Sequence, residues 1–454
     1  MANSNGWGDG AANNAIGWGQ GANNAIAWGD SHAKSWAGAT DIVGLTTDPA
    51  ASAFITATGI TGATQQAAID NLVKGLKTDG LWSKMKAVYP FVTDNRNLLG
   101  YTEDFSNTAW GKVQNATVTT NTFTAPNGTL TADTITGTIN STNPTTSNGS
   151  KVFYHSGNNA TIQAQNNTLT GSIYVYATTA ITIQLFMYEW GGAEFGQSYT
   201  LSANTWQRIS ITSTFSGGTG NVGLAIQSNA NTLYAWGAQL ELGSTATTYQ
   251  PIATTQQAYI SSQFKYNLVN PVDSDAAFRL VFNGGWTHSS TGATPNGTNG
   301  YADTKLNVTG LSSLHYSYYS RTTNTTGREI GVETPSNAWD LILSLGGTIY
   351  NRFGTSSISL ANADSKGFYI GTESNSLSHK LFKNGSQIGT TQTYGGSYPS
   401  KEVYLGAINS TLGATYFSAK QTAFSTIGDG LTDTEASNLY SRVNTFQVAL
   451  SRNV

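Results

Sequence analysis

Two glutamates are the first residues whose type and spacing could support catalysis. Glu189 and Glu194 lie in MYEWGGAEFG, beside Tyr188 and Trp190, where they could face each other across a Gly-Gly turn. Paired carboxylates beside aromatic rings are the groups that a glycoside hydrolase uses. Nothing in the sequence supplies the raised pKa that the acid of such a pair needs. We therefore interpret the pair as carboxylates of an exposed turn and expect no catalytic residue.

Histidine and cysteine chemistry is equally sparse. The chain has no cysteine, which excludes disulfides and thiolate metal sites. No H-x-x-x-H, G-x-S-x-G or phosphate-loop pattern accompanies the five scattered histidines, which are His32, His155, His288, His315 and His379. The sequence predicts no enzyme, no cofactor and no metal site.

Sugar binding is the chemistry for which this sequence has many suitable residues. Aromatic side chains stack on the apolar faces of pyranose rings, and neighbouring amides and hydroxyls bind the sugar hydroxyls. The cores of β-sandwiches also contain aromatic residues, and we interpret Trp236, within LYAWGAQLE, as a core residue. Trp190 and Trp339 are flanked by Gly, Asn or Ser in expected loops, where the sequence is compatible with either exposure or burial. The candidate glycan-binding residues are Tyr188, Trp190, Trp286, His288, Trp339 and Asp340.

Most of these candidates lie in or beside expected strands. GSIYVYA, AITIQLFMYEW, TWQRISITSTF and NVGLAIQ alternate apolar and polar residues, which predicts an antiparallel sandwich. NLLGYTEDFSNTAW, APNGTLTADTIT and LYAWGAQLELGSTATTYQP resemble the start, middle and end of a carbohydrate-binding-module-like jelly roll. That domain occurs in tail fibres and other virion proteins of bacteriophages. The resemblance covers Asn97 to Pro251, and we assign residues 95–251 to this domain.

A second β-rich module is expected at residues 265–454, after a linker at 252–264. HKLFKNGSQIG predicts a hairpin with an Asn-Gly turn. Thr432 and Glu435 form a capping-box pattern before a C-terminal helix, and its apolar face consists of Ala436, Leu439, Val443 and Phe446. With strands such as LHYSYYSR and GFYIGTES, this half resembles the concanavalin-A-like (laminin-G-like) sandwich domains of phage structural proteins.

A helical hairpin is expected at residues 49–94. Its first helix has an apolar face of Ile69, Leu72, Val73 and Leu76; Thr61 or Thr64 can cap its start and Gly80 its end. A second short helix is expected from Leu81 to about Tyr89, ended by Pro90. The resemblance to phage proteins implies that the jelly roll is inserted into a unit made of this hairpin and the second sandwich.

The first 48 residues form a Gly-rich leader in which one short sequence motif is repeated almost three times. The leader holds four regularly placed tryptophans, Trp7, Trp18, Trp28 and Trp36. Glycine-rich segments are commonly flexible tethers, but tethers seldom contain side chains that bury 150–250 Å². A docking peptide, in which each indole enters a pocket of another virion subunit, is the alternative that we favour.

Composition narrows the possible roles further. Only 10% of residues are charged and the net charge is −3, which gives no electrostatic reason to bind nucleic acid. No apolar run is long enough for a membrane span, and the start resembles no secretory signal. Together these features suggest a virion protein made in the host cytoplasm and exposed on the particle surface.

We therefore expect a mainly β protein with two antiparallel β-sandwich (jelly-roll and lectin-like) domains. Its expected role is a non-enzymatic tail or head fibre, or receptor-binding protein, of a tailed bacteriophage. Its expected partners are other virion proteins (portal, tail or capsid), bound through the N-terminus, and host surface polysaccharide; the resemblance implies a homotrimer. A decoration protein that binds no glycan and a glycan depolymerase are the alternatives.

Overall fold

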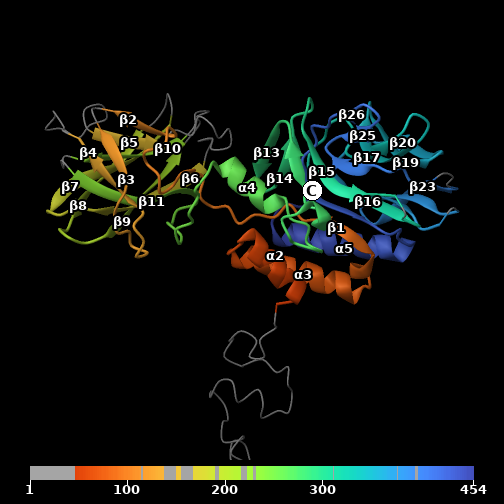
Figure 1. The fold of residues 1–454 in the computed structure, drawn as a ribbon, viewed down its shortest axis with the longest axis horizontal. Coiled ribbons are helices and arrows are strands. Elements are labelled where there is room, and N and C mark those ends of the chain that lie inside the picture. Colours follow the sequence, from red (N-terminus) through yellow and green to blue (C-terminus); the bar gives the residue numbers. More distant parts are fainter. Residues whose placement is uncertain are drawn as a thin grey trace, which may run out of the picture. The chain divides into compact units, whose positions relative to one another are not determined.

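The computed structural model describes residues 47–113, 116–137, 150–154, 167–189, 194–215, 222–228, 232–309, 311–375, 377–393 and 397–454. These residues are mainly β, in four sheets, with helices α2 (Pro49–Thr58), α3 (Ala63–Thr78), α4 (Gln256–Phe264) and α5 (Asp433–Ala449) (Figure 1). The predicted fold class is therefore confirmed. The leader tryptophans Trp7, Trp18, Trp28 and Trp36 lie outside the described residues.

The first pair of sheets encloses one core. Sheet I has the order β2 (Trp110–Val113), β5 (Ser150–Tyr154), β10 (Val222–Ser228), β7 (Ile181–Glu189), β8 (Glu194–Leu201). Sheet II has the order β3 (Thr117–Phe123), β4 (Ala132–Thr136), β11 (Thr232–Leu242), β6 (Asn167–Tyr176), β9 (Gln207–Phe215). On strands β6 and β7, alternate residues are apolar and buried between the sheets, for example Leu185 and Met187 of β7 and Ile173 and Val175 of β6.

The second pair of sheets encloses a separate core that includes Trp339, Leu341 and Tyr316. Sheet III has the order β13 (Trp286–Ser289), β14 (Gly292–Pro295), β27 (Thr422–Gly428), β16 (Leu314–Ser320), β21 (Gly367–Glu373), β22 (His379–Lys383), β23 (Ser386–Gln392). Sheet IV has the order β12 (Val281–Asn283), β15 (Tyr301–Asn307), β24 (Glu402–Leu405), β17 (Ile330–Glu333), β18 (Ala338–Leu345), β19 (Thr348–Gly354), β20 (Ser356–Ala361), with β25 (Ile408–Ser410) and β26 (Gly413–Thr415) beside β17.

The hairpin predicted from HKLFKNGSQIG is confirmed. Strands β22 and β23 are antiparallel neighbours, with Lys383 opposite Ser386. Between them, Asn384 has φ 49° and Gly385 has φ 79°, the left-handed conformations that a two-residue type I′ turn requires.

The second helix expected at residues 81–89 is wrong. Trp82–Lys84 form a single 3-10 turn, and Met85–Tyr89 form strand β1, which pairs antiparallel with β27 of sheet III. Four of the five β1 residues are buried, because the strand is part of a sheet that faces the core. Tertiary pairing thus overrides a local pattern that was compatible with a helix.

Helix α3 has the predicted apolar face, with Ile69, Leu72, Val73 and Leu76 buried, but a different N-terminal cap. Its N-cap residue is Gly62, and no side-chain capping hydrogen bond forms at this end of the helix. Neither Thr61 nor Thr64 therefore caps it. The Asp94 carboxylate instead accepts hydrogen bonds from the backbone N–H of Thr61 (2.6 Å) and Gly62 (3.0 Å). The predicted C-terminal glycine, Gly80, is confirmed, with φ 71°.

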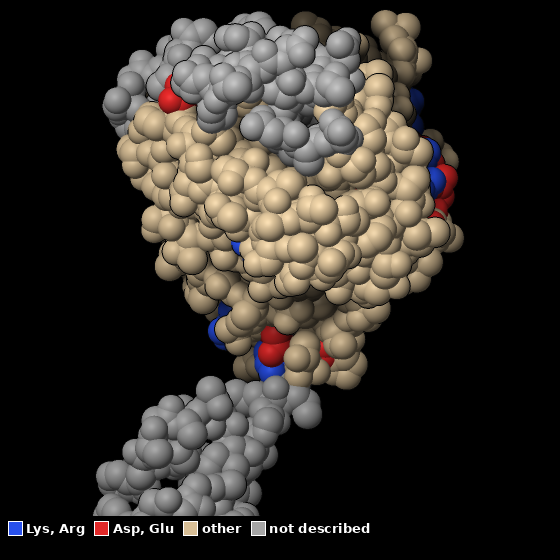
Figure 2. Space-filling view, turned by 90° about the vertical axis from the view of Figure 1, so that its left-hand side faces the viewer, with Lys and Arg blue, Asp and Glu red and all other residues tan. Residues whose placement is uncertain are grey.

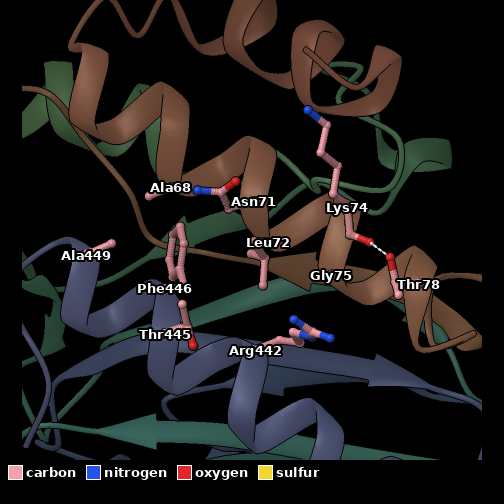
Figure 3. A pocket seen from close by; sticks show the side chains of 10 residues that line it. All are labelled: Ala68, Asn71, Leu72, Lys74, Gly75, Thr78, Arg442, Thr445, Phe446 and Ala449. Atoms are coloured by element: carbon pink, nitrogen blue, oxygen red, sulfur yellow. Dashed lines mark hydrogen bonds between the residues drawn. The ribbon is translucent and has the colours of Figure 1, made fainter. Parts of the chain in front are cut away.

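Helix α5 has the predicted capping box between Thr432 and Glu435, and Ala436, Leu439, Val443 and Phe446 are buried. It packs against sheet III, where the rings of Phe446 and Phe424 are 5.9 Å apart. It also lies beside α3 across a cavity of about 380 Å³, into which Phe446 projects (Figure 3).

A close approach joins α3 to α5. Arg442 crosses α3 at Gly75, where a Cβ atom would lie 2.6 Å from Arg442 Cδ. The guanidinium then donates to both Asp79 oxygens, over 2.7 Å and 2.9 Å. A side chain at position 75 would push Arg442 away from this bidentate contact.

The segment after β11 contains a helix that the sequence did not reveal. Residues 256–264, expected to be linker, form α4, whose N-cap Thr255 accepts a hydrogen bond from Ala258 N. The Gln263 Nε2 atom of this helix donates to Asp94 Oδ1 (3.3 Å), and Gln250 Nε2 donates to the Asp94 carbonyl (3.2 Å). The two chain segments that flank sheets I and II therefore meet at Asp94.

We predict that Phe446→Ala lowers the free energy of unfolding by about 3–5 kcal/mol, because it removes a buried ring. Val448→Ala in the same helix is the matched control, since Val448 is 52% exposed. Chemical denaturation of both variants, repeated over a dilution series, measures the effect. A concentration-dependent loss would place Phe446 at an oligomer interface, and no loss would contradict both views.

The independent folding of residues 97–251 stays a prediction. Deleting 96–251, so that Asn95 joins Ile252, should leave the remainder folded with a cooperative thermal transition. Its midpoint should fall modestly, because the Gln250 contacts with Asp94 are lost. Aggregation of the shortened protein would refute the insertion.

Candidate functional site

Trp286 and His288, two predicted candidates, lie together on β13 but form a closed cluster. The Trp286 indole donates to the carbonyls of Asn283 (3.1 Å) and Tyr301 (3.2 Å). His288 is 5% exposed, and its ring contacts those of Trp286 and Phe282. Burial lowers the pKa of His288 to about 4, so the ring is neutral at pH 7. His288 Nε2 is unpaired, but the groups packed around it are aromatic rings.

The expectation that Trp339 lies in a loop is wrong. It is in β18, is 2% exposed and belongs to the core between sheets III and IV. Asp340, next in the strand, points to the opposite face and has no exposure. Arg352 on β19 binds both carboxylate oxygens of Asp340, one over 2.8 Å. Neither residue can stack on or directly contact a sugar in this conformation.

Tyr188 lies on the outer face of sheet I, while Trp190 is outside the described residues. Strand β7 alternates strictly: Leu185 and Met187 enter the core. Gln184, Phe186 and Tyr188 therefore project from the opposite side of the sheet. This alternation is why an amide and two rings form one row.

Small residues flank this row on both neighbouring strands. On β10, Ala225 is opposite Phe186 and Gly223 is opposite Tyr188. On β8, Gly196 is opposite Phe186, and a Cβ there would lie 2.4 Å from Phe186 Cε1. A glycine is required at position 196 because the Phe186 ring lies across the strand.

A second amide, Gln227 on β10, stands directly opposite Gln184. Gln227 is 2% exposed, yet neither its Nε2 nor its Oε1 atom has a hydrogen-bond partner. Leaving a buried amide unpaired costs about 1–3 kcal/mol. Gln184 Nε2, in contrast, donates to Ser198 Oγ over 3.1 Å. Buried amides in proteins are normally satisfied, so the unpaired Gln227 amide is the exception on this face. A ligand can supply the missing partner only if the groups that cover Gln227 move aside.

Tyr188 adds a hydroxyl at one end of the row. The ring is half-buried, and burial, with a smaller effect from Glu194, raises the pKa of its hydroxyl. The hydroxyl therefore stays protonated at neutral pH and can donate a hydrogen bond. We call Gln184, Phe186, Tyr188 and Gln227 the amide–aromatic face.

The two glutamates of the possible hydrolase pair are separated by this geometry. Glu194 is opposite Tyr188 in the β7–β8 ladder, so it shares the outer face. Glu189 follows Tyr188 in β7 and projects toward the other face. The pair therefore does not converge on one site.

The outer face of sheet II also has many rings, but these are packed against one another and against residues 123–131. Phe123 stacks on Tyr234 with centroids 4.0 Å apart. The Trp206 indole donates to the Thr124 carbonyl and the Trp236 indole to Thr131 Oγ1, each over 3.0 Å. The interpretation of Trp236 as a buried residue is confirmed, at 5% exposure. These indole donors are already satisfied, unlike the Gln227 amide.

Two carboxyl groups with raised pKa values lie apart from this face. Burial raises the pKa of Asp133 to about 6, and its carboxylate accepts from the backbone N–H of Phe105 and Asn121. Burial also raises the pKa of Glu373 to about 7, and the Tyr398 hydroxyl donates to it. In the part of the chain that the structure describes, no three His, Cys, Asp or Glu side chains are grouped to hold a metal. None of its helices is long and apolar enough to cross a bilayer.

Comparisons with known proteins give structural neighbours only. No protein-family model and no curated protein sequence matches this chain. The CBM22-1 xylan-binding domain of Paenibacillus barcinonensis Xyn10C is similar over 36% of this chain and 96% of its own (13% identity, TM-score 0.25). TmCBM61, solved with β-1,4-galactotriose, is similar over 33% and 100% (12%, 0.25). The enzymatically active domain of bacteriophage CBA120 tailspike protein 4 is similar over 32% of this chain and 21% of its own (13%, 0.25).

We predict that Glu373→Gln changes how stability depends on pH. The folded-state pKa of about 7 exceeds the ordinary 4.5, so the folded protein holds this proton more tightly than the unfolded chain. The Glu373 contribution is therefore fully present below pH 4.5 and is lost as pH rises to about 7. The variant should lack this loss, and its stability relative to wild type should rise by up to about 3 kcal/mol across the window.

Urea denaturation of both proteins at several pH values measures the difference. Comparison in matched buffers removes the opposite trend expected from His288, His315 and His379, whose pKa values are lowered to about 4 in both proteins. A difference that is constant with pH would contradict the prediction.

Proposed function

We propose that this protein is a non-enzymatic tail or head fibre, or receptor-binding protein, of a tailed bacteriophage, and that it adheres to host surface glycans. The amide–aromatic face of sheet I is the proposed glycan-binding surface. The leader with its four tryptophans is the proposed attachment to the virion. Trimeric assembly and exposure on the particle surface belong to the same proposal.

The unpaired amide of Gln227 is the observation that carries the glycan-binding part. A primary amide offers two donors and an acceptor, which match vicinal sugar hydroxyls. The Phe186 and Tyr188 rings beside it offer apolar area for the C–H face of a pyranose. Phe186 is 4% exposed and Tyr188 is half-buried, so the proposal requires that the groups covering this face move aside when a ligand binds.

The surface charge favours a neutral glycan over a charged one. Figure 2 views the molecule from the side on which β7 and β8 lie in Figure 1, and few charged side chains are visible on the tan surface. The whole chain has 22 Lys and Arg against 25 Asp and Glu. Recognition by stacking and hydrogen bonding needs no excess of either sign.

Attachment to a particle is supported by the sequence of the leader. Tryptophan is enriched among the residues that dominate protein interfaces, and each leader indole is preceded or followed by glycines, alanines or serines that permit close backbone approach. The β-rich domains after the leader then supply the adhesive surface.

We predict that Gln227→Leu weakens glycan binding by at least about tenfold, because the amide loses its sugar partners. The same change should raise the free energy of unfolding by about 1 kcal/mol, because it removes an unpaired buried amide. Isothermal titration with a hit from a glycan array, together with urea denaturation of the full chain, measures both effects.

Gln239→Leu is the matched control, since Gln239 is also buried but is fully engaged. Its Nε2 donates to Glu241 Oε1 (2.7 Å), and its Oε1 accepts from Gln250 N (2.7 Å). This control should lose stability and keep its glycan affinity in the folded protein. A wild-type chain that binds no glycan on the array would favour the decoration-protein alternative.

A further inference from the structure

A second exposed ring stands on the other sandwich, on the outer face of sheet IV. Tyr416 follows β26 and is 51% exposed. The guanidinium carbon of Arg328 lies 3.6 Å from the centroid of this ring, so one face of the ring is covered. The exposed area must then belong largely to the opposite face and the edge of the ring.

Paired charges fix the groups beneath Tyr416. Arg328 Nη1 donates to Glu333 Oε2 over 3.0 Å, and Arg352 Nη1 lies 3.7 Å from Glu333 Oε1. Arg352 is in turn held by Asp340, which has no exposure. Asp340 is thus a positioning residue. The positive charges of Arg328 and Arg352 are balanced by the negative charges of Glu333 and Asp340.

The backbone permits this arrangement because of one glycine. Gly331 of β17 lies between Tyr404 and Asp340 in the cross-strand row, and a Cβ there would lie 2.5 Å from Asp340 Cβ. Its φ of 142° also belongs to the region that favours glycine.

The helices near this sandwich lie on the side of sheet III, as the contact of Phe446 with Phe424 shows, and no labelled helix covers sheet IV in Figure 1.

Two polar groups beside Tyr416 have no hydrogen-bond partner. Arg328 Nε is buried without a partner, and so is the hydroxyl of Thr415, the residue before Tyr416. The side chains of Arg352 and Glu333 are 24% and 23% exposed, which leaves part of each within reach of a ligand. A planar ring, guanidinium donors and a carboxylate acceptor are the groups that bind a sugar ring and its hydroxyls.

We propose that Tyr416, Arg328, Arg352 and Glu333 form a second carbohydrate site, which binds one pyranose of a neutral glycan against the free face of Tyr416. The ligand is neutral because the two guanidiniums have no excess charge to offer a uronate or phosphate. This site is on a different pair of sheets from the amide–aromatic face and does not depend on it.

The test uses the full chain in a Gln227→Leu background, so that binding to sheet I is weakened. The probes are three neutral hexasaccharides: cellohexaose, xylohexaose and mannohexaose. We expect at least one to bind, and Tyr416→Ala to weaken that binding by more than about tenfold. Tyr416→Phe keeps the ring and should bind within about threefold of the parent.

Two further measurements keep the outcome decisive. Melting temperatures exclude unfolding of the variants, and sedimentation velocity reports the oligomeric state. Absence of binding by all three probes, or equal binding by Tyr416→Ala and its parent, would overturn the second site. A change of oligomeric state in Tyr416→Ala with unchanged sugar binding would overturn the site and make this ring a subunit contact, beside Leu412, which is 88% exposed. Failure of Gln227→Leu to alter binding would count against the sheet I proposal alone.

Discussion

The pairing of β1 with β27 is the contact on which the rest of the described fold depends. Residues 85–89 complete a sheet whose other strands all follow residue 285, although sheets I and II come between them in the chain. Arg452, buried near the end of the chain, donates to the carbonyls of Pro90, Phe91 and Ala423 and so joins the same two segments. The chain must therefore leave sheet III after residue 89 and return to it. The hydrogen bond from Gln250 Nε2 to the Asp94 carbonyl joins the segment by which the chain leaves sheet III to the segment by which it returns.

Hydrogen-bond satisfaction then distinguishes the two faces of the first sandwich. Both outer faces present aromatic rings, and ring content alone would favour sheet II. On sheet II, however, the Trp206 and Trp236 indoles have protein partners and the rings contact one another. On sheet I, Gln227 has none. A bound glycan would remove the cost of this unpaired amide, and for that reason we propose sheet I, the face with fewer rings, as the binding surface.

Local sequence patterns predicted what local physics determines. The alternation of β7, the Asn384–Gly385 turn and the capping box of α5 each depend on a few neighbouring residues, and all are confirmed. The strand at residues 85–89 could not be predicted in this way, because its partner lies more than 330 residues away. The prediction of the α3 cap was wrong for the same reason, because the carboxylate that binds the start of this helix belongs to the distant residue Asp94.

The candidate site was predictable only in part. Tyr188 was found because a ring beside glycines and acids is visible in the sequence, whereas Gln227 lies in the unremarkable string NVGLAIQ. Its significance arises from the β7–β10 register and from the absence of a hydrogen-bond partner, and both depend on the three-dimensional structure. Trp339 and Asp340 failed as candidates because the chain buries both, the ring in the core and the carboxylate under Arg352. Asp340 nevertheless holds the groups beneath Tyr416.

A crystal structure of the full chain with a glycan selected on an array is the most direct measurement. We predict sugar density across Phe186 and Tyr188, with hydroxyl oxygens about 2.7–3.2 Å from both polar atoms of the Gln227 amide. Sugar bound only elsewhere, with the Gln227 amide still unpaired beneath an empty sheet I, would contradict the assignment of this face.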